Sequence, residues 1–194
     1  MDQNVKVAVR VRPLSQKEIN RGCKEVVSCS GKQINVAGET KDDTKNFTFD
    51  FCYDASSTQI QVFDDIAKPV LMKALDGFNG TVFAYGQTGS GKTHSMMGAP
   101  GLPGIIPLLN GEIFRRVDER VVKMTNEAPD GTEINVRISV SFLEIYNEIV
   151  KDLLNPSDKA LQIREDPGKG IYVQNLCELI VQSEDDVLRL IEQG

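Results

Sequence analysis

The feature that most constrains this chain is a glycine-rich loop at residues 86–93, which reads Gly-Gln-Thr-Gly-Ser-Gly-Lys-Thr. It matches the phosphate-loop pattern G-x-x-x-x-G-K-[ST] at every fixed position. Glycines let backbone N–H groups approach phosphate oxygens closely, and a helix that follows adds a favourable dipole. We therefore expect a nucleoside triphosphate and Mg²⁺ to bind here. The expected cofactor-binding residues of the loop are Gly86, Gln87, Thr88, Gly89, Ser90, Gly91, Lys92 and Thr93.

Two side chains of this loop have chemically distinct expected roles. Lys92 is the expected catalytic residue, because the lysine of a phosphate loop reaches the β- and γ-phosphates. Thr93 is the expected metal ligand, since its hydroxyl can bind Mg²⁺. The flanking sequence supports both roles. Residues 80–85 are β-branched and aromatic and predict a buried strand, and residues 94–97 lack proline and are compatible with a helix. A glycine-rich turn that binds nothing is the less favoured alternative.

Composition and charge limit the class of protein, the partners and the cellular compartment that can be expected. The 194 residues are 40% hydrophobic and 26% charged, which is typical of a globular domain. No apolar run is long enough for a membrane span, so no membrane partner is expected. The net charge of −6, with dispersed basic residues, disfavours nucleic acid as a partner. Four scattered cysteines and a single histidine disfavour a zinc site and indicate free thiols in a reducing compartment, with the cytosol as default.

Hydrophobic periodicity predicts alternating strands and helices, hence a layered α/β domain with the nucleotide at the carboxyl end of the strand that precedes the loop. A helix is predicted from the capping residues 56–59 to Leu75, another over residues 105–126, and a third after the capping-box-like Ser183. The predicted strands are 5–11, 33–36, 46–51, 135–144, 150–154, 160–164 and 171–176.

Four blocks of the sequence, in the same order, resemble the kinesin motor domain family. The likeness runs from residue 4 to the end of the chain. The blocks are Val5–Leu14 with its R-x-R-P element, Phe78–Tyr85 continuing through the loop to His94-Ser95-Met96, Gly104–Pro107, and Phe142–Glu148 followed by Val150–Leu154.

The resemblance implies a three-layer, kinesin-type phosphate-loop NTPase fold with a central mixed sheet. It implies ATP and Mg²⁺ as cofactors, microtubule-stimulated ATP hydrolysis, microtubule-based movement, tubulin as a partner, and a cytoplasmic location on the cytoskeleton. The parent protein is expected to oligomerise through a stalk. Arg10, Arg12 and Pro13 would line the adenine and ribose side of the pocket, and His94 would lie beside the base or sugar.

The chain also departs from the family pattern. The first switch, N-x-x-S-S-R-S-H, and the second, D-x-x-G-x-E, do not occur in it. Residues 1–194 are therefore expected to be one truncated domain, the N-terminal portion of a motor. Because phosphoryl transfer needs a positioned water and charge stabilisation that the switches supply, we expect this stretch to bind ATP without turnover. In this family the strands beside the phosphate-loop strand come from the missing part, so its N–H and C=O groups would lack partners. We therefore expect the stretch by itself to be marginally stable, aggregation-prone or completed by another segment or chain.

Two alternative functions differ in how well they fit the sequence. A short form that binds nucleotide or tubulin without hydrolysis fits the missing switches equally well. A phosphate-loop kinase of small substrates does not account for the blocks at Arg10–Pro13 and Phe142–Leu154.

Overall fold

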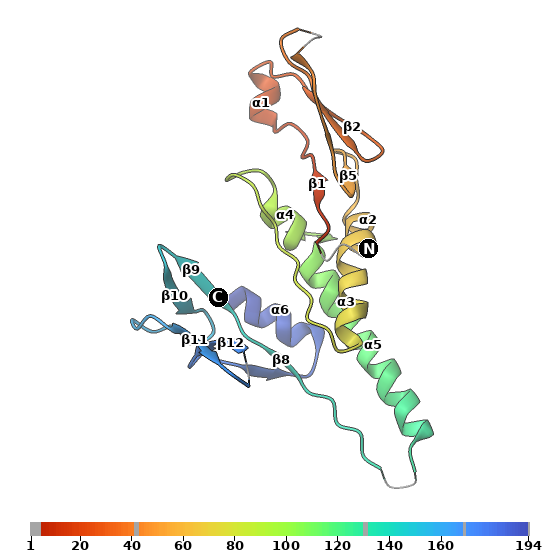
Figure 1. The fold of residues 1–194 in the computed structure, drawn as a ribbon, viewed down its shortest axis with the longest axis vertical. Coiled ribbons are helices and arrows are strands. Elements are labelled where there is room, and N and C mark those ends of the chain that lie inside the picture. Colours follow the sequence, from red (N-terminus) through yellow and green to blue (C-terminus); the bar gives the residue numbers. More distant parts are fainter. Residues whose placement is uncertain (1–4, 41–42, 130–131, 169, 194) are drawn as a thin grey trace. The chain divides into compact units, whose positions relative to one another are not determined.

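The computed structural model describes residues 5–40, 43–129, 132–168 and 170–193. It divides into two compact units, Met1–Leu109 and Asn110–Gly194. Helix α5 (Ile105–Glu127) begins in the first unit and ends in the second. Figure 1 shows the succession of helices and strands along the chain.

The strands of the first unit form a parallel pair and an antiparallel meander. β1 (Ala8–Arg10) runs parallel to β5 (Phe51–Tyr53), with Ala8 opposite Phe51. β3 (Gln33–Val36) lies between β2 (Val27–Ser30) and β4 (Lys45–Thr48) and is antiparallel to both. The alternating sequence correctly predicted the strand over residues 33–36, but the single strand predicted over residues 46–51 is divided in the structure, because β4 pairs with β3 and β5 pairs with β1.

The helices of the first unit begin where the sequence places capping residues. α1 (Gln16–Asn20) starts with a capping box between Ser15 and Glu18. Thr58 caps a continuous helical stretch, because its hydroxyl accepts a hydrogen bond from the Gln61 N–H. That stretch consists of α2 (Gln59–Val62), a π-helical turn η2 (Phe63–Ala67) and α3 (Lys68–Leu75). α4 (Lys92–Met96) follows the glycine-rich loop.

The core of the first unit lies where β5 meets these helices. Its buried members are Tyr53, Val62, Phe63, Ala67 and Ile105. Met96 of α4 packs against this cluster, so the helix after the glycine-rich loop is attached to the core.

The segment before the loop differs from the prediction. Residues 80–85 form no strand in the structure, and Phe83 and Tyr85 are 79% and 95% exposed, although Val82 packs against the core. The prediction of a buried strand was wrong because an apolar run becomes a strand only when a neighbouring strand satisfies its N–H and C=O groups. Among the residues that the structure describes, no strand pairs with this segment.

A minimal strand pair lies within residues 98–103. β6 (Gly98–Ala99) is antiparallel to β7 (Leu102–Pro103). Gly98 has a φ of 91°, and a Cβ at this position would lie 2.2 Å from the Leu102 carbonyl oxygen. A side chain would therefore prevent this close approach of the two backbones.

The second unit contains antiparallel strand pairs, residues 110–127 of α5 and a final helix. β8 (Ile138–Val140) pairs with β13 (Leu179–Val181), β9 (Leu143–Tyr146) with β10 (Ile149–Asp152), and β11 (Gln162–Asp166) with β12 (Gly170–Gln174). The prediction of one long strand over residues 135–144 was wrong, because β8 and β9 have different partners and the hydrogen-bond ladder breaks between them.

The last helix, α6 (Glu184–Gln193), confirms the capping-box prediction at Ser183. The Asp186 N–H donates to the Ser183 hydroxyl at 3.2 Å, and the Ser183 N–H donates to the Asp186 carboxylate at 3.1 Å. Both groups would otherwise be unsatisfied at the start of the helix.

The mixed α/β class is confirmed, but the expected central mixed sheet is not observed. Across the described residues the strands form five separate pairs and one three-stranded sheet. Sheet assembly depends on partners that are distant in sequence, which local patterns do not specify. No helix in the described part of the chain is long and apolar enough to cross a membrane.

Candidate nucleotide site

The glycine-rich loop leads directly into a helix, as a phosphate loop requires. Gly91 is the residue before α4 and has a left-handed φ of 99°, which glycine adopts without steric cost. Among the described residues, no side chain caps the start of this helix. Its first backbone N–H groups are therefore available to an anion at the loop.

Lys92 folds back over the loop from which it emerges. Its ammonium group donates hydrogen bonds to the carbonyl oxygens of Gly86 at 2.7 Å and Gln87 at 3.0 Å. The Gln87 carbonyl also accepts a bond from the Ser90 N–H at 3.1 Å, which closes the turn within the loop. A positive charge thus lies at the same loop as the N-terminus of α4.

Thr93 and His94 occupy the first turn of α4, and both residues are exposed. No group of three or more His, Cys, Asp or Glu residues within the described ranges could hold a metal ion. Mg²⁺ at nucleotide sites is bound by few protein groups, with water and phosphate oxygens completing its coordination. A single hydroxyl beside the loop, that of Thr93, suits this donor set.

Arg10 lies at the end of β1, and its guanidinium is held by three acceptors. It donates to the Gln59 side-chain oxygen at 2.6 Å, the Ser57 carbonyl at 3.1 Å and the Ser95 hydroxyl at 3.2 Å. Burial lowers the pKa of Arg10 from its ordinary value. The structure thus brings Arg10 to α4, but its donors are directed at protein groups.

Arg12 and Pro13 lie just beyond β1 and are exposed. The Arg12 guanidinium forms a two-pronged ion pair with Glu18, at 2.6 and 2.7 Å, and donates to the Pro13 carbonyl at 2.9 Å. Hydrogen bonds from Arg12 and Ser15 hold the pKa of Glu18 well below its ordinary value. A Cβ at Gly91 would lie 3.9 Å from the Cβ of Arg12, so this residue is adjacent to the end of the loop.

Gln59 belongs to the same constellation, and sequence patterns did not identify it as a site residue. It is 7% exposed and lies at the first position of α2. Its amide joins Arg10 to the backbone carbonyl of His94. The only signal in the sequence was its position beside the predicted N-cap, which says nothing about a contact 35 residues away.

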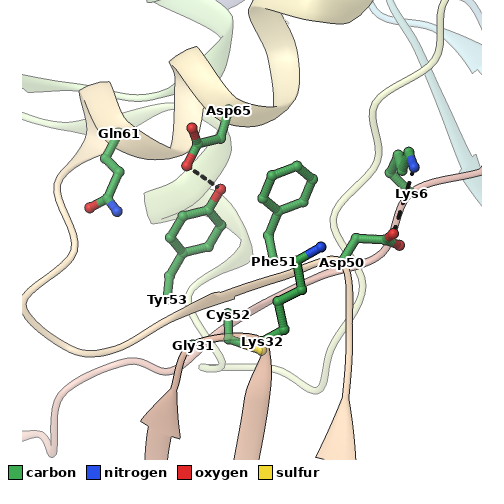
Figure 2. Close-up of a pocket in the computed structure, with 9 residues that line it drawn as sticks. All are labelled: Lys6, Gly31, Lys32, Asp50, Phe51, Cys52, Tyr53, Gln61 and Asp65. Atoms are coloured by element: carbon green, nitrogen blue, oxygen red, sulfur yellow. Dashed lines mark hydrogen bonds and ion pairs between the residues drawn. The ribbon is translucent and has the colours of Figure 1, made fainter.

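A separate pocket of about 280 Å³ lies between β5 and α2 and contains no residue of the glycine-rich loop. Figure 2 shows its parallel rings of Phe51 and Tyr53, whose centroids are 6.4 Å apart, and the hydrogen bond from the Tyr53 hydroxyl to Asp65. Lys6 and Asp50 form an ion pair at 3.7 Å on another side of the pocket. The pocket is lined by two lysines and two aspartates, Lys6, Lys32, Asp50 and Asp65, so it has no single-sign surface for an anion such as phosphate.

A glycine-rich loop, a helix that begins at its last glycine and a lysine folded over its carbonyls are typical of the phosphate-loop class of nucleotide-binding proteins. The sequence model of the kinesin motor domain matches residues 10–194. The chain therefore belongs to the kinesin motor family.

Two kinesin-like proteins, one from Dictyostelium discoideum and one from human, are similar to this chain in sequence. Kinesin-related protein 1 of Dictyostelium discoideum is 40% identical, over 98% of this chain and 9% of its own length. The human kinesin-like protein KIF1C is also 40% identical, over 98% of this chain and 18% of its own length. The chain thus spans less than a fifth of either relative.

Solved structures of KIF14 resemble the fold closely. KIF14 residues 391–755, solved with ADP in complex with a microtubule, give a TM-score of 0.83 at 34% identity over 98% of this chain and 54% of that chain. The KIF14 dimer of residues 391–772, in its two-heads-bound state with AMP-PNP and a microtubule, gives 0.86 at 32% identity over 100% and 54%. The chain therefore corresponds to about half of a KIF14 motor.

Proposed function

We propose that this chain is the ATP-binding part of a kinesin-like microtubule motor and that ATP binds at residues 86–93 with Mg²⁺. The observation that carries the proposal is the position of Lys92, whose ammonium group is hydrogen-bonded to carbonyls of the loop beside the uncapped start of α4. This places a cation and free backbone N–H groups together, which is the combination that binds a polyphosphate.

The site residues have distinct proposed roles. Lys92 would bind the terminal phosphates, Thr93 would ligate Mg²⁺, and the loop N–H groups would hold the phosphate chain. Mg²⁺, when bound, would neutralise charge on the phosphate oxygens. Arg12, Pro13 and His94 would lie near the base and sugar, which fits the exposure of all three residues and the proximity of Arg12 to Gly91.

Motor activity is proposed for a kinesin-like motor that contains this sequence together with the switch sequences. The solved KIF14 heads are complexes with microtubules and adenine nucleotides. By that likeness, we propose microtubule-stimulated ATP hydrolysis, a microtubule partner and a cytoplasmic location on the cytoskeleton. Residues 1–194 alone are proposed to bind nucleotide without turnover, as the nucleotide-binding portion of a single motor domain.

The proposed site is tested by the change Lys92→Ala. Loss of a charged donor to phosphate is expected to weaken binding of a fluorescent ATP analogue by roughly 10- to 100-fold. The matched control is Lys73→Ala, which removes an exposed lysine from α3 and is expected to leave the dissociation constant unchanged. Equal affinities for the wild-type chain and Lys92→Ala would rule out Lys92 as a phosphate ligand.

A further inference from the structure

We propose that Gln59 is a positioning residue of the nucleotide site, which holds the helix after the phosphate loop in place by joining its carboxyl end to Arg10. The inference rests on the proposed function, because it assigns Gln59 to the same site. Gln59 contacts neither the loop nor any group expected to touch phosphate; it acts through α4.

The orientation of the Gln59 side-chain amide is determined by its two hydrogen-bond partners. Arg10 can only donate, so the oxygen of the amide faces it, at 2.6 Å from Nη1. The His94 carbonyl can only accept, so the nitrogen of the amide faces that carbonyl, also at 2.6 Å. The side chain is 7% exposed, so water offers little replacement for either bond.

The His94 carbonyl needs a partner from outside its helix. α4 ends at Met96, so the N–H four residues after His94 is not part of the helix. The Gln59 amide therefore caps the carboxyl end of α4. Arg10 adds a second attachment, because it also donates to the Ser95 hydroxyl at 3.2 Å.

Fixing the end of α4 also fixes its beginning, since the helix has only five residues. Lys92 and Thr93 form its first turn, and Gly91 directly precedes it. A shift of one end of so short a rigid element moves the ammonium and hydroxyl groups at the other end. Displacements of about 1 Å are sufficient to weaken binding and catalysis substantially.

The test is the isosteric change Gln59→Glu. A carboxylate keeps the acceptor for Arg10 but has no N–H for the His94 carbonyl, so only the attachment to α4 is lost. Gln61→Glu is the matched control: it is the same change, two residues along in α2, at an exposed side chain outside this network. We expect Gln59→Glu to raise the dissociation constant for the fluorescent ATP analogue about tenfold and Gln61→Glu to leave it unchanged.

Two further measurements separate positioning from general destabilisation. Amide hydrogen exchange in residues 92–97 is expected to rise in Gln59→Glu while exchange in β2, β3 and β4 stays as in the wild type. The melting temperatures of the two glutamate variants are expected to be similar. If Gln59→Glu does not fold, Gln59→Asn serves instead, because its side chain is one methylene too short to make both bonds.

The outcomes distinguish this inference from the proposed function. Equal nucleotide affinities and equal exchange at residues 92–97 in the Gln59 and Gln61 variants would overturn the role of Gln59. Absence of nucleotide binding by the wild-type chain would overturn the proposed function instead. In that case hydrogen exchange, which needs no nucleotide, still decides whether Gln59 holds α4.

Discussion

Tyr53 joins strand β5 to the helical stretch that follows it. Its side chain is 2% exposed, and its hydroxyl donates a hydrogen bond to Asp65 at 3.0 Å. Burial and this bond raise the pKa of Tyr53 above its ordinary value of 10.0. The folded state therefore retains the phenolic proton to higher pH than the unfolded state does, and the contribution of Tyr53 to stability is complete below pH 10 and is lost as the pH rises beyond it.

The change Tyr53→Phe tests this linkage. It removes the hydroxyl and retains the ring, so we expect the free energy of unfolding at pH 7 to fall by about 1 kcal/mol. The alkaline loss of stability contributed by this group should disappear as well. Urea titrations between pH 7 and 11 measure both effects, with Tyr85→Phe as control because Tyr85 is 95% exposed. If the free energy of unfolding of Tyr53→Phe fell above pH 10 as much as that of the wild type, the proposed contribution of the Tyr53 hydroxyl would be wrong.

Arg10 illustrates which contacts of a single residue can be predicted from the sequence and which cannot. The family resemblance predicts that Arg10 lines the adenine and ribose side of the pocket, and the structure brings it close to the helix of the phosphate loop. Its hydrogen bonds, however, go to Gln59, Ser57 and Ser95. Sequence spacing could not reveal this, because the contacts span 47 to 85 residues and depend on how β1, α2 and α4 pack.

At the scale of elements, local sequence patterns predicted the structure best where a short-range hydrogen bond caps the start of a helix or closes a turn. The capping box at Ser183 begins α6 as predicted, and a capping box at Ser15, which was not predicted, begins α1. Asn147 and Glu148 join β9 to β10. Both residues have positive φ angles, 48° and 64°. These are the angles of a type I′ hairpin turn, in which asparagine followed by glycine is preferred.

The change Glu148→Gly is therefore expected to stabilise the hairpin. A non-glycine residue in the left-handed region costs about 1–2 kcal/mol, and the greater flexibility of glycine in the unfolded chain offsets part of that. We expect a net gain of about 0.5–1 kcal/mol in the free energy of unfolding, measured by urea denaturation. The control Glu144→Gly, within β9, should lower stability. A loss of stability in both variants would contradict the turn assignment.

For the whole molecule, the main question is how much of a motor this sequence supplies. The loop, Lys92 and Thr93 are present, and the chain corresponds to 54% of the KIF14 structures. Phe83 and Tyr85, in the segment directly before the loop, are exposed, and no strand among the described residues pairs with this segment. Exposed aromatic side chains and unpaired backbone groups favour association with other protein.

The corresponding prediction concerns turnover. We expect residues 1–194 to bind ATP but to hydrolyse it no faster with microtubules than without them. A chain extended to include both switch sequences of the family should show microtubule-stimulated hydrolysis, because water positioning and charge stabilisation are then complete. A phosphate-release assay on both chains measures this. Microtubule-stimulated turnover by residues 1–194 alone would contradict the proposal that this stretch binds ATP without hydrolysing it.

The sequence by itself determined the family, the phosphate-loop pattern and the elements that depend on neighbouring residues, such as caps, turns and long amphipathic helices. These follow from short-range hydrogen bonds and periodicity, which are written in consecutive residues. Only the tertiary structure decided that residues 80–85 form no strand, that the strands form separate sheets, and that Gln59 joins Arg10 to α4. Each of these depends on which distant backbone or side chain supplies a hydrogen-bond partner.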